Sequence, residues 1–215
     1  AFILNERGLN RAIDCGVKKV DTSMSLHEGY GFKNTGMKSD RAYEEMARLV
    51  HLAHLHDIRI RVGLQCAWGV ASEAAPSADS VLSCVEKLLA LDPDTICLAD
   101  TAGLATPKNV RKYLEIIIPQ IDGKPLVIHF HETMQGGLAN IQEALQFGVR
   151  EFDSSLGGLG GSPFMVNTRG NIATEDVVKS MDELDIYTGI DRLVLMDTAS
   201  QLKRTLKSTP LKSAI

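Results

Sequence analysis

The chain has 215 residues, of which 44% are hydrophobic and 23% are charged, a composition typical of an ordinary water-soluble globular domain. Its formal net charge of −4, with Lys and Arg scattered along the sequence, argues against a basic surface for nucleic acid. No apolar stretch approaches the roughly 20 residues that a membrane span requires, so no membrane partner is expected.

Short apolar runs rich in β-branched residues alternate along the chain with amphipathic segments of helical period. In chain order, strands are predicted over residues 2–4, 19–23, 58–65, 95–99, 126–130 and 151–155. Helices are predicted over residues 5–15, 39–56, 77–91, 107–119, 136–147, 174–184 and 191–206. The longest irregular stretches, residues 24–38 and 66–77, both follow strands and are predicted to be loops.

This alternation of strands and helices indicates an α/β fold, in which helices cover a parallel sheet. Because each strand–helix repeat takes about 30 residues, the leading prediction is a TIM (β/α)8 barrel. About six β/α units are represented in this chain, whereas a complete barrel typically needs about 250 residues. An open doubly wound sheet, which could close with six strands, therefore stays as the alternative architecture.

The four cysteines, Cys15, Cys66, Cys84 and Cys97, have neither the spacing of a CxxC motif nor that of a disulfide-rich module. We expect reduced thiols, as is usual for proteins of a cytoplasmic compartment. A cytoplasmic location is therefore the expectation.

Several predicted strands end in side chains that can carry chemistry. His129 and His131 are two positions apart after an apolar run, so both imidazoles project to the same side of the strand. Two nitrogen ligands placed in this way suit a divalent cation, although a strand cap beside a satisfied core histidine explains the pair equally well. Asp100 ends the preceding strand, where a carboxylate either orients a ligand or caps the following turn.

A glycine-rich loop, residues 157–163, follows the last predicted strand and contains Ser162. Its four glycines in five residues allow a ligand to approach closely, so the loop is either a lid over a site or a loose connector. Asn171 follows it and offers a hard oxygen ligand for Mg²⁺ or Mn²⁺ beside imidazoles; a turn residue is the plainer interpretation. A barrel would bring these strand-end residues to one mouth.

Taken together, these motifs resemble the 3-hydroxy-3-methylglutaryl-CoA lyase family, a branch of the metal-dependent lyase and synthase TIM barrels. The stretches that carry the resemblance are residues 97–107, His129-Phe130-His131, residues 157–164 and residues 170–176. The resemblance implies that His129, His131 and Asn171 bind a divalent cation, Mg²⁺ or Mn²⁺. It also implies an acyl-CoA substrate and a homodimer. The predicted catalytic residues are Ser162, Asp100 and His129.

Two features depart from the family pattern. The family's fourth metal ligand, an aspartate beside a catalytic arginine on the first strand, has no match, because residues 2–5 resemble the third strand. Residues 1–215 are therefore predicted to form one lyase-like barrel domain that is incomplete at its N-terminus. In addition, Ser162 replaces a cysteine thought to act in proton transfer, and an alcohol is a far weaker acid than a thiol, whose pKa is about 8.5.

The predicted function is metal-dependent retro-Claisen cleavage of a 3-hydroxy-acyl-CoA, such as 3-hydroxy-3-methylglutaryl-CoA, to acetyl-CoA and a 3-oxo acid. Three alternatives stay open. A synthase would use the same metal site in the condensing direction, an inactive homologue would keep only the metal site, and an unrelated metal-dependent aldolase would cleave free carboxylates.

Overall fold

A computed structural model of the protein describes residues 1–71, 73–132, 136–164 and 170–208. Within these residues one sheet runs in chain order, each strand pairing in parallel with the next. Its strands are β1 (Lys19–Ser25), β2 (Arg59–Gln65), β3 (Thr95–Ala99), β4 (Leu126–His129) and β5 (Glu151–Asp153). A doubly wound sheet would reverse its strand order at a switch point, so this unbroken order indicates a barrel.

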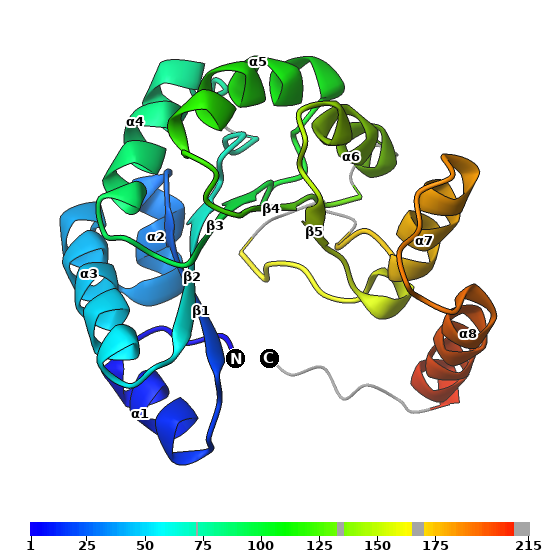
Figure 1. Ribbon diagram of the computed structural model, residues 1–215, viewed down its shortest axis with the longest axis horizontal. Coiled ribbons are helices and arrows are strands. Elements are labelled where there is room, and N and C mark those ends of the chain that lie inside the picture. The colour runs from blue at the N-terminus through cyan, green and yellow to red at the C-terminus, as the bar shows by residue number, and fades with distance from the viewer. Residues whose placement is uncertain (72, 133–135, 165–169, 209–215) are drawn as a thin grey trace.

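Helices connect the strands and cover the outer side of the sheet (Figure 1). They are α1 (Glu6–Asp14), α2 (Glu28–Thr35), α3 (Ser39–Leu55), α4 (Ala78–Leu89), α5 (Pro107–Ile117), α6 (Gly137–Gln146), α7 (Thr174–Glu183) and α8 (Arg192–Ser208), with short 3-10 turns η1 (Ile118–Gln120) and η2 (Leu156–Gly158). None of the described helices is long and apolar enough to cross a membrane.

The sheet curves around an interior but leaves the barrel open between β1 and β5 (Figure 1). The predicted partial TIM barrel is therefore confirmed, although five strands form where six were predicted. Of the predicted strand 2–4, only a single parallel bridge from Phe2 to Asp21 is present. On the other side a parallel bridge from Ser155 to Ala173 continues the barrel order beyond β5.

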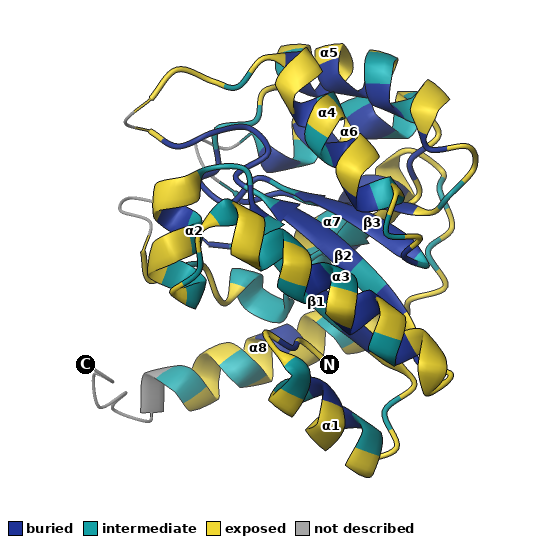
Figure 2. Ribbon diagram, turned by 90° about the vertical axis from the view of Figure 1, so that its left-hand side faces the viewer, coloured by how far each residue is buried: buried dark blue, intermediate teal, exposed yellow. Residues whose placement is uncertain are grey.

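Along β2, successive side chains point alternately to the apolar core under the helices and to the cavity inside the barrel. Ile60, Val62 and Leu64 are fully buried and belong to the apolar core under the outer helices. The residues between them, among them Arg61, line the interior cavity instead. Figure 2 shows the same division, with buried strands beneath helices whose outer faces are exposed. Polar residues at alternate strand positions therefore face the inside of the barrel.

Helix α2 lies within the stretch 24–38 that was predicted to be a loop, so that prediction is wrong for these residues. Its sequence, with two glycines in the first four positions, lacks the apolar period of a surface helix. Local capping supports the helix instead. The His27 imidazole Nδ1 accepts a hydrogen bond from the Tyr30 amide at 2.9 Å, and Gly36 ends the helix in the left-handed region at φ 72°.

Candidate metal centre and active site

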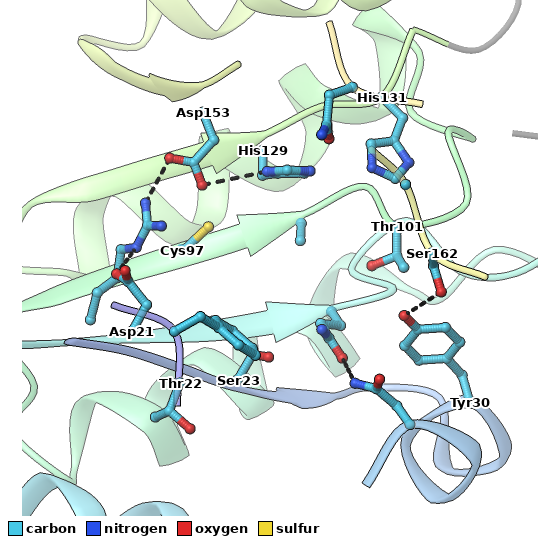
Figure 3. A pocket seen from close by; sticks show the side chains of 18 of the residues that line it. Asp21, Thr22, Ser23, Tyr30, Cys97, Thr101, His129, His131, Asp153 and Ser162 are labelled. Atoms are coloured by element: carbon cyan, nitrogen blue, oxygen red, sulfur yellow. Dashed lines mark hydrogen bonds and ion pairs between the residues drawn. The ribbon is translucent and has the colours of Figure 1, made fainter. Parts of the chain in front are cut away.

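A cavity of about 370 Å³ occupies the inside of the curved sheet and reaches the carboxyl ends of its strands (Figure 3). Its polar lining includes Asp21, Arg61, His129, His131, Asp153 and Ser162. Ligands of parallel barrels bind at this end of the strands, so the cavity is the candidate active site.

His129, His131 and Asn171 all line this cavity, as the strand-end argument predicts. The two imidazole ring centroids are 5.1 Å apart, and the rings meet edge to face. Phe130 between them is buried in the core, which fixes both neighbours on the opposite side. Asn171 is paired with His131 through an antiparallel bridge. The fold therefore brings the three predicted ligands together.

Two atoms of this group are buried and make no hydrogen bond within the described part of the chain: His131 Nδ1 and Asn171 Oδ1. A buried polar atom without a partner is costly, so such atoms usually indicate a ligand or water. Burial, together with the neighbouring His129, lowers the pKa of His131 to about 4. The imidazole is therefore neutral at pH 7 and keeps a lone pair for a ligand.

No group of three or more His, Cys, Asp or Glu side chains suited to a metal is present in the described ranges. Beside the two imidazoles, the buried amide oxygen of Asn171 is a further donor in this cavity. Two imidazole nitrogens and one amide oxygen form a mixed nitrogen and oxygen donor set that suits a divalent cation. The residues present thus fit a divalent cation.

The glycine-rich loop is built around Asn171. The Asn171 amide Nδ2 donates a hydrogen bond to the Leu159 carbonyl at 2.8 Å. Gly160 has φ +99°, and a Cβ atom there would lie 2.8 Å from the same nitrogen. Gly170 is equally confined, since its Cβ would lie 2.5 Å from the Gly160 carbonyl oxygen. Of the two alternatives for this loop, the structure therefore favours close approach at a site over a loose connector.

Substituting Gly160 with alanine is expected to cost more stability than the same change at Gly148. Both glycines have positive φ, which costs a side chain about 1–2 kcal/mol, but open space surrounds the Cβ position at Gly148. We expect Gly148→Ala to lower the free energy of unfolding by about 1 kcal/mol and Gly160→Ala by about 3 kcal/mol, because Asn171 must also move. Urea unfolding of both variants measures the difference, and equal losses would show that the loop does not enclose Asn171.

A chain of charged groups in the cavity wall supports His129, and Figure 3 shows Asp153 beside the His129 imidazole. The His129 Nδ1 atom lies 3.4 Å from Asp153 Oδ2, and the other Asp153 oxygen accepts a hydrogen bond from Arg61 at 2.8 Å. Arg61 also donates to Asp21 at 2.6 Å. Against the opposing effect of burial, the hydrogen bonds from His129 and Arg61 lower the pKa of Asp153 to about 2. Asp153 is therefore an anion that orients the His129 ring.

This pKa predicts an acid-dependent contribution of Asp153 to stability. Because the pKa falls from its ordinary value near 4 to about 2 on folding, the contribution is complete above about pH 4 and is lost as the pH falls toward 2. We expect the difference in unfolding free energy between wild type and Asp153→Asn to shrink by about 1 kcal/mol between about pH 5 and pH 3. Urea unfolding at both pH values measures it, and a difference that stays constant would contradict the assignment.

Asp21, Arg61 and Asp153 were not among the site residues predicted from the sequence. A signal was present, since each is a charged residue inside a predicted strand and charges seldom occupy buried strands without partners. Asp153 is also the residue of β5 that pairs in register with His129.

Asp100, one of the three predicted catalytic residues, does not line the cavity. Its carboxylate is buried and accepts hydrogen bonds from the amides of Leu104 at 2.8 Å and Ala105 at 3.1 Å. Asp100 is absent from the cavity lining, which its neighbour Thr101 joins instead. Burial raises the pKa of Asp100 to about 6. The structure therefore places Asp100 as the cap of the turn after β3, which the sequence left open as the alternative.

Ser162 lies in the cavity with a partner that the sequence did not reveal. The Tyr30 hydroxyl donates a hydrogen bond to Ser162 Oγ at 2.9 Å, and the Phe164 amide donates to the same oxygen at 3.3 Å. Tyr30 belongs to α2, the helix absent from the predicted elements, so its place in the cavity had no basis in the sequence.

The chain is similar in sequence and fold to several known proteins. A family model described as HMGL-like matches residues 1–202. The chain is 30% identical to the hydroxymethylglutaryl-CoA lyase of Bacillus subtilis over 99% of its own length and 71% of that protein. It is 32% identical to the mitochondrial hydroxymethylglutaryl-CoA lyase of Gallus gallus, over 91% of this chain and 66% of that protein. The chain thus spans about two thirds of the length of these curated relatives.

Solved structures show the same likeness. An HMG-CoA lyase of Acinetobacter baumannii, solved in complex with coenzyme A and 3-methylmalate, matches with a TM-score of 0.90 and 31% identity. That match covers 98% of this chain and 69% of the solved one. The HMG-CoA lyase of Bacillus subtilis matches with a TM-score of 0.91 and 30% identity, over all of this chain and 72% of the other.

Proposed function

The chain belongs to the HMGL-like family, and on that premise we propose that it is a divalent-metal-dependent carbon–carbon lyase. Its substrate is a 3-hydroxy-acyl-CoA such as 3-hydroxy-3-methylglutaryl-CoA, which a retro-Claisen reaction cleaves to acetyl-CoA and a 3-oxo acid. The observation that carries the proposal is the meeting of His129, His131 and Asn171 in one cavity, with two buried atoms that lack partners among the described residues.

His129, His131 and Asn171 are the residues proposed to hold the cation, Mg²⁺ or Mn²⁺. When bound, the cation supplies Lewis-acid polarisation of the substrate hydroxyl and lowers the pKa of that group. His131 is neutral at pH 7, so it binds a cation without first losing a proton.

The ion pairs that Arg61 forms with Asp21 and Asp153 hold the His129 side of the cavity in place. Asp153 engages Nδ1 of His129, which leaves Nε2 as the nitrogen for a ligand. Arg61 forms ion pairs with Asp21 and Asp153, so both of these partly buried carboxylates have a cationic partner. These residues support the proposed site by fixing the His129 ring before a ligand arrives.

Ser162 is proposed to serve the proton step. Cleavage leaves an acyl-CoA enolate, which must receive a proton at carbon, and Ser162 is a hydroxyl at the cavity wall. The cysteine-to-serine change also favours the competing hypothesis of an inactive metal-binding homologue, because an alcohol alone is a weak acid. Asp100 is left out of the proposed chemistry, since both its oxygens are engaged in the turn.

Two further properties are proposed: a homodimer, from the family resemblance, and a cytoplasmic location, from cysteines that have neither the spacing of a CxxC motif nor that of a disulfide-rich module.

The test is turnover of 3-hydroxy-3-methylglutaryl-CoA by the purified protein with added Mg²⁺ or Mn²⁺. We expect release of acetyl-CoA that stops when EDTA removes the cation. Failure to release acetyl-CoA from any 3-hydroxy-3-alkylglutaryl-CoA would overturn the proposal. In parallel reactions, condensation of an acyl-CoA with a 2-oxo acid would identify a synthase, and cleavage of free carboxylates an aldolase.

A further inference from the structure

The contact between Tyr30 and Ser162 joins two elements that are 132 positions apart in the chain, at the wall of the cavity (Figure 3). The Tyr30 hydroxyl donates to Ser162 Oγ, and the Phe164 amide donates to it as well. Ser162 therefore accepts two hydrogen bonds, and its own proton remains available to a molecule in the cavity.

Packing around the Tyr30 ring fixes the position of its hydroxyl at the cavity wall. The side chain is 6% exposed and packs with Cys66 and Val70 in a small apolar cluster. Its ring meets that of Phe164 edge to face, with centroids 6.5 Å apart. The first turn of α2, capped by His27, fixes the backbone. Such packing fixes the position of the hydroxyl without a second polar partner among the described contacts.

The proposed reaction needs a proton donor, and the contact between Tyr30 and Ser162 can provide one. A serine hydroxyl is a poor acid by itself, whereas a phenol has a reference pKa of about 10, much closer to the 8.5 of a thiol. Burial raises the pKa of Tyr30, so the phenol is protonated at neutral pH and can donate. Burial makes this phenol a weaker acid than a free one, but it remains a stronger acid than an alcohol and so supplies acidity that the serine lacks.

We propose that Tyr30 and Ser162 form a two-residue proton relay that protonates the enolate product. The Ser162 proton moves to the enolate carbon and forms the new C–H bond, while the Tyr30 proton moves to Ser162 Oγ. Ser162 thus ends as a neutral alcohol, and Tyr30 ends as a phenolate that regains a proton from water. This inference rests on the proposed lyase function, and Tyr30 acts through Ser162 rather than on the substrate.

A set of kinetic variants tests the relay. We expect Tyr30→Phe, which keeps the ring packing, to lower kcat for cleavage by about 10²-fold while KM changes by less than about threefold. In a Ser162→Ala background the same change should alter kcat by less than about twofold, because two residues of one relay are not additive. Tyr30→Phe within about twofold of wild type, or an equal loss in both backgrounds, would overturn the relay.

A second measurement does not need turnover, so it separates failure of the relay from failure of the proposed function. In Ser162→Cys, the Tyr30 hydroxyl should stabilise the thiolate at position 162 and speed its alkylation by iodoacetamide at neutral pH. Adding Tyr30→Phe should slow alkylation by about tenfold, the effect of about one pKa unit. Peptide mass mapping distinguishes this thiol from the exposed Cys15 and from Cys66 beside Tyr30. A change of less than about twofold would contradict the contact, whatever the substrate.

Discussion

His131→Ala is expected to weaken binding of Mn²⁺ by more than about 100-fold and to lower kcat for thioester cleavage by about 10³-fold or more. A bound cation supplies several kcal/mol of charge stabilisation in the transition state, and about 4 kcal/mol corresponds to this factor. The variant removes a buried imidazole whose Nδ1 has no hydrogen-bond partner in the described residues.

Isothermal titration with Mn²⁺, beside steady-state kinetics, measures both effects. His51→Ala is the matched control, because His51 is an exposed histidine on α3, outside the cavity lining. The control should bind Mn²⁺ and turn over like the wild type. Unchanged Mn²⁺ affinity in His131→Ala would exclude this histidine as a ligand.

The second large effect is expected for Asp153→Asn, which should weaken Mn²⁺ binding by about 10- to 100-fold. Loss of the carboxylate that orients a metal-binding histidine typically costs this much. In this protein the change removes the anion beside His129 and one of the two carboxylates that Arg61 contacts.

Asp21→Asn provides the comparison that isolates the role of His129. It removes the other carboxylate partner of Arg61 and leaves the contact between Asp153 and His129 in place. We expect its Mn²⁺ affinity to stay within about threefold of wild type, a much smaller change than the weakening of about 10- to 100-fold expected for Asp153→Asn. Equal weakening in both variants would mean that net charge around Arg61, and not the orientation of His129, sets the affinity.

The barrel could be predicted because its strands are short apolar runs at regular spacing. Strand β3 forms over the residues predicted, and the other four strands differ from prediction by only a few residues at their ends. Position also predicted the meeting of His129, His131 and Asn171, since strand ends converge in a parallel barrel. What the pattern did not determine was the orientation of single side chains: Asp100 lies at a strand end, yet its carboxylate turns back to cap its own loop.

Other parts of the site depend on contacts between distant segments. Helix α2 was missed because local capping by His27 and Gly36, and not apolar period, stabilises it, and the position of Tyr30 was missed with it. The contact of Arg61 with Asp153 spans 92 positions and follows from the register of the strands. The glycines around Asn171 were noticed, but only the backbone geometry shows that a Cβ atom at Gly160 would displace the asparagine.

The most direct test of the metal centre is pulsed electron paramagnetic resonance of Mn²⁺ bound to the purified protein. Nitrogen couplings from two imidazoles are expected, and one set should disappear in each of His129→Ala and His131→Ala. A Mn²⁺ spectrum with water protons alone, or one that keeps both nitrogen couplings in either variant, would contradict a cation held between these two histidines.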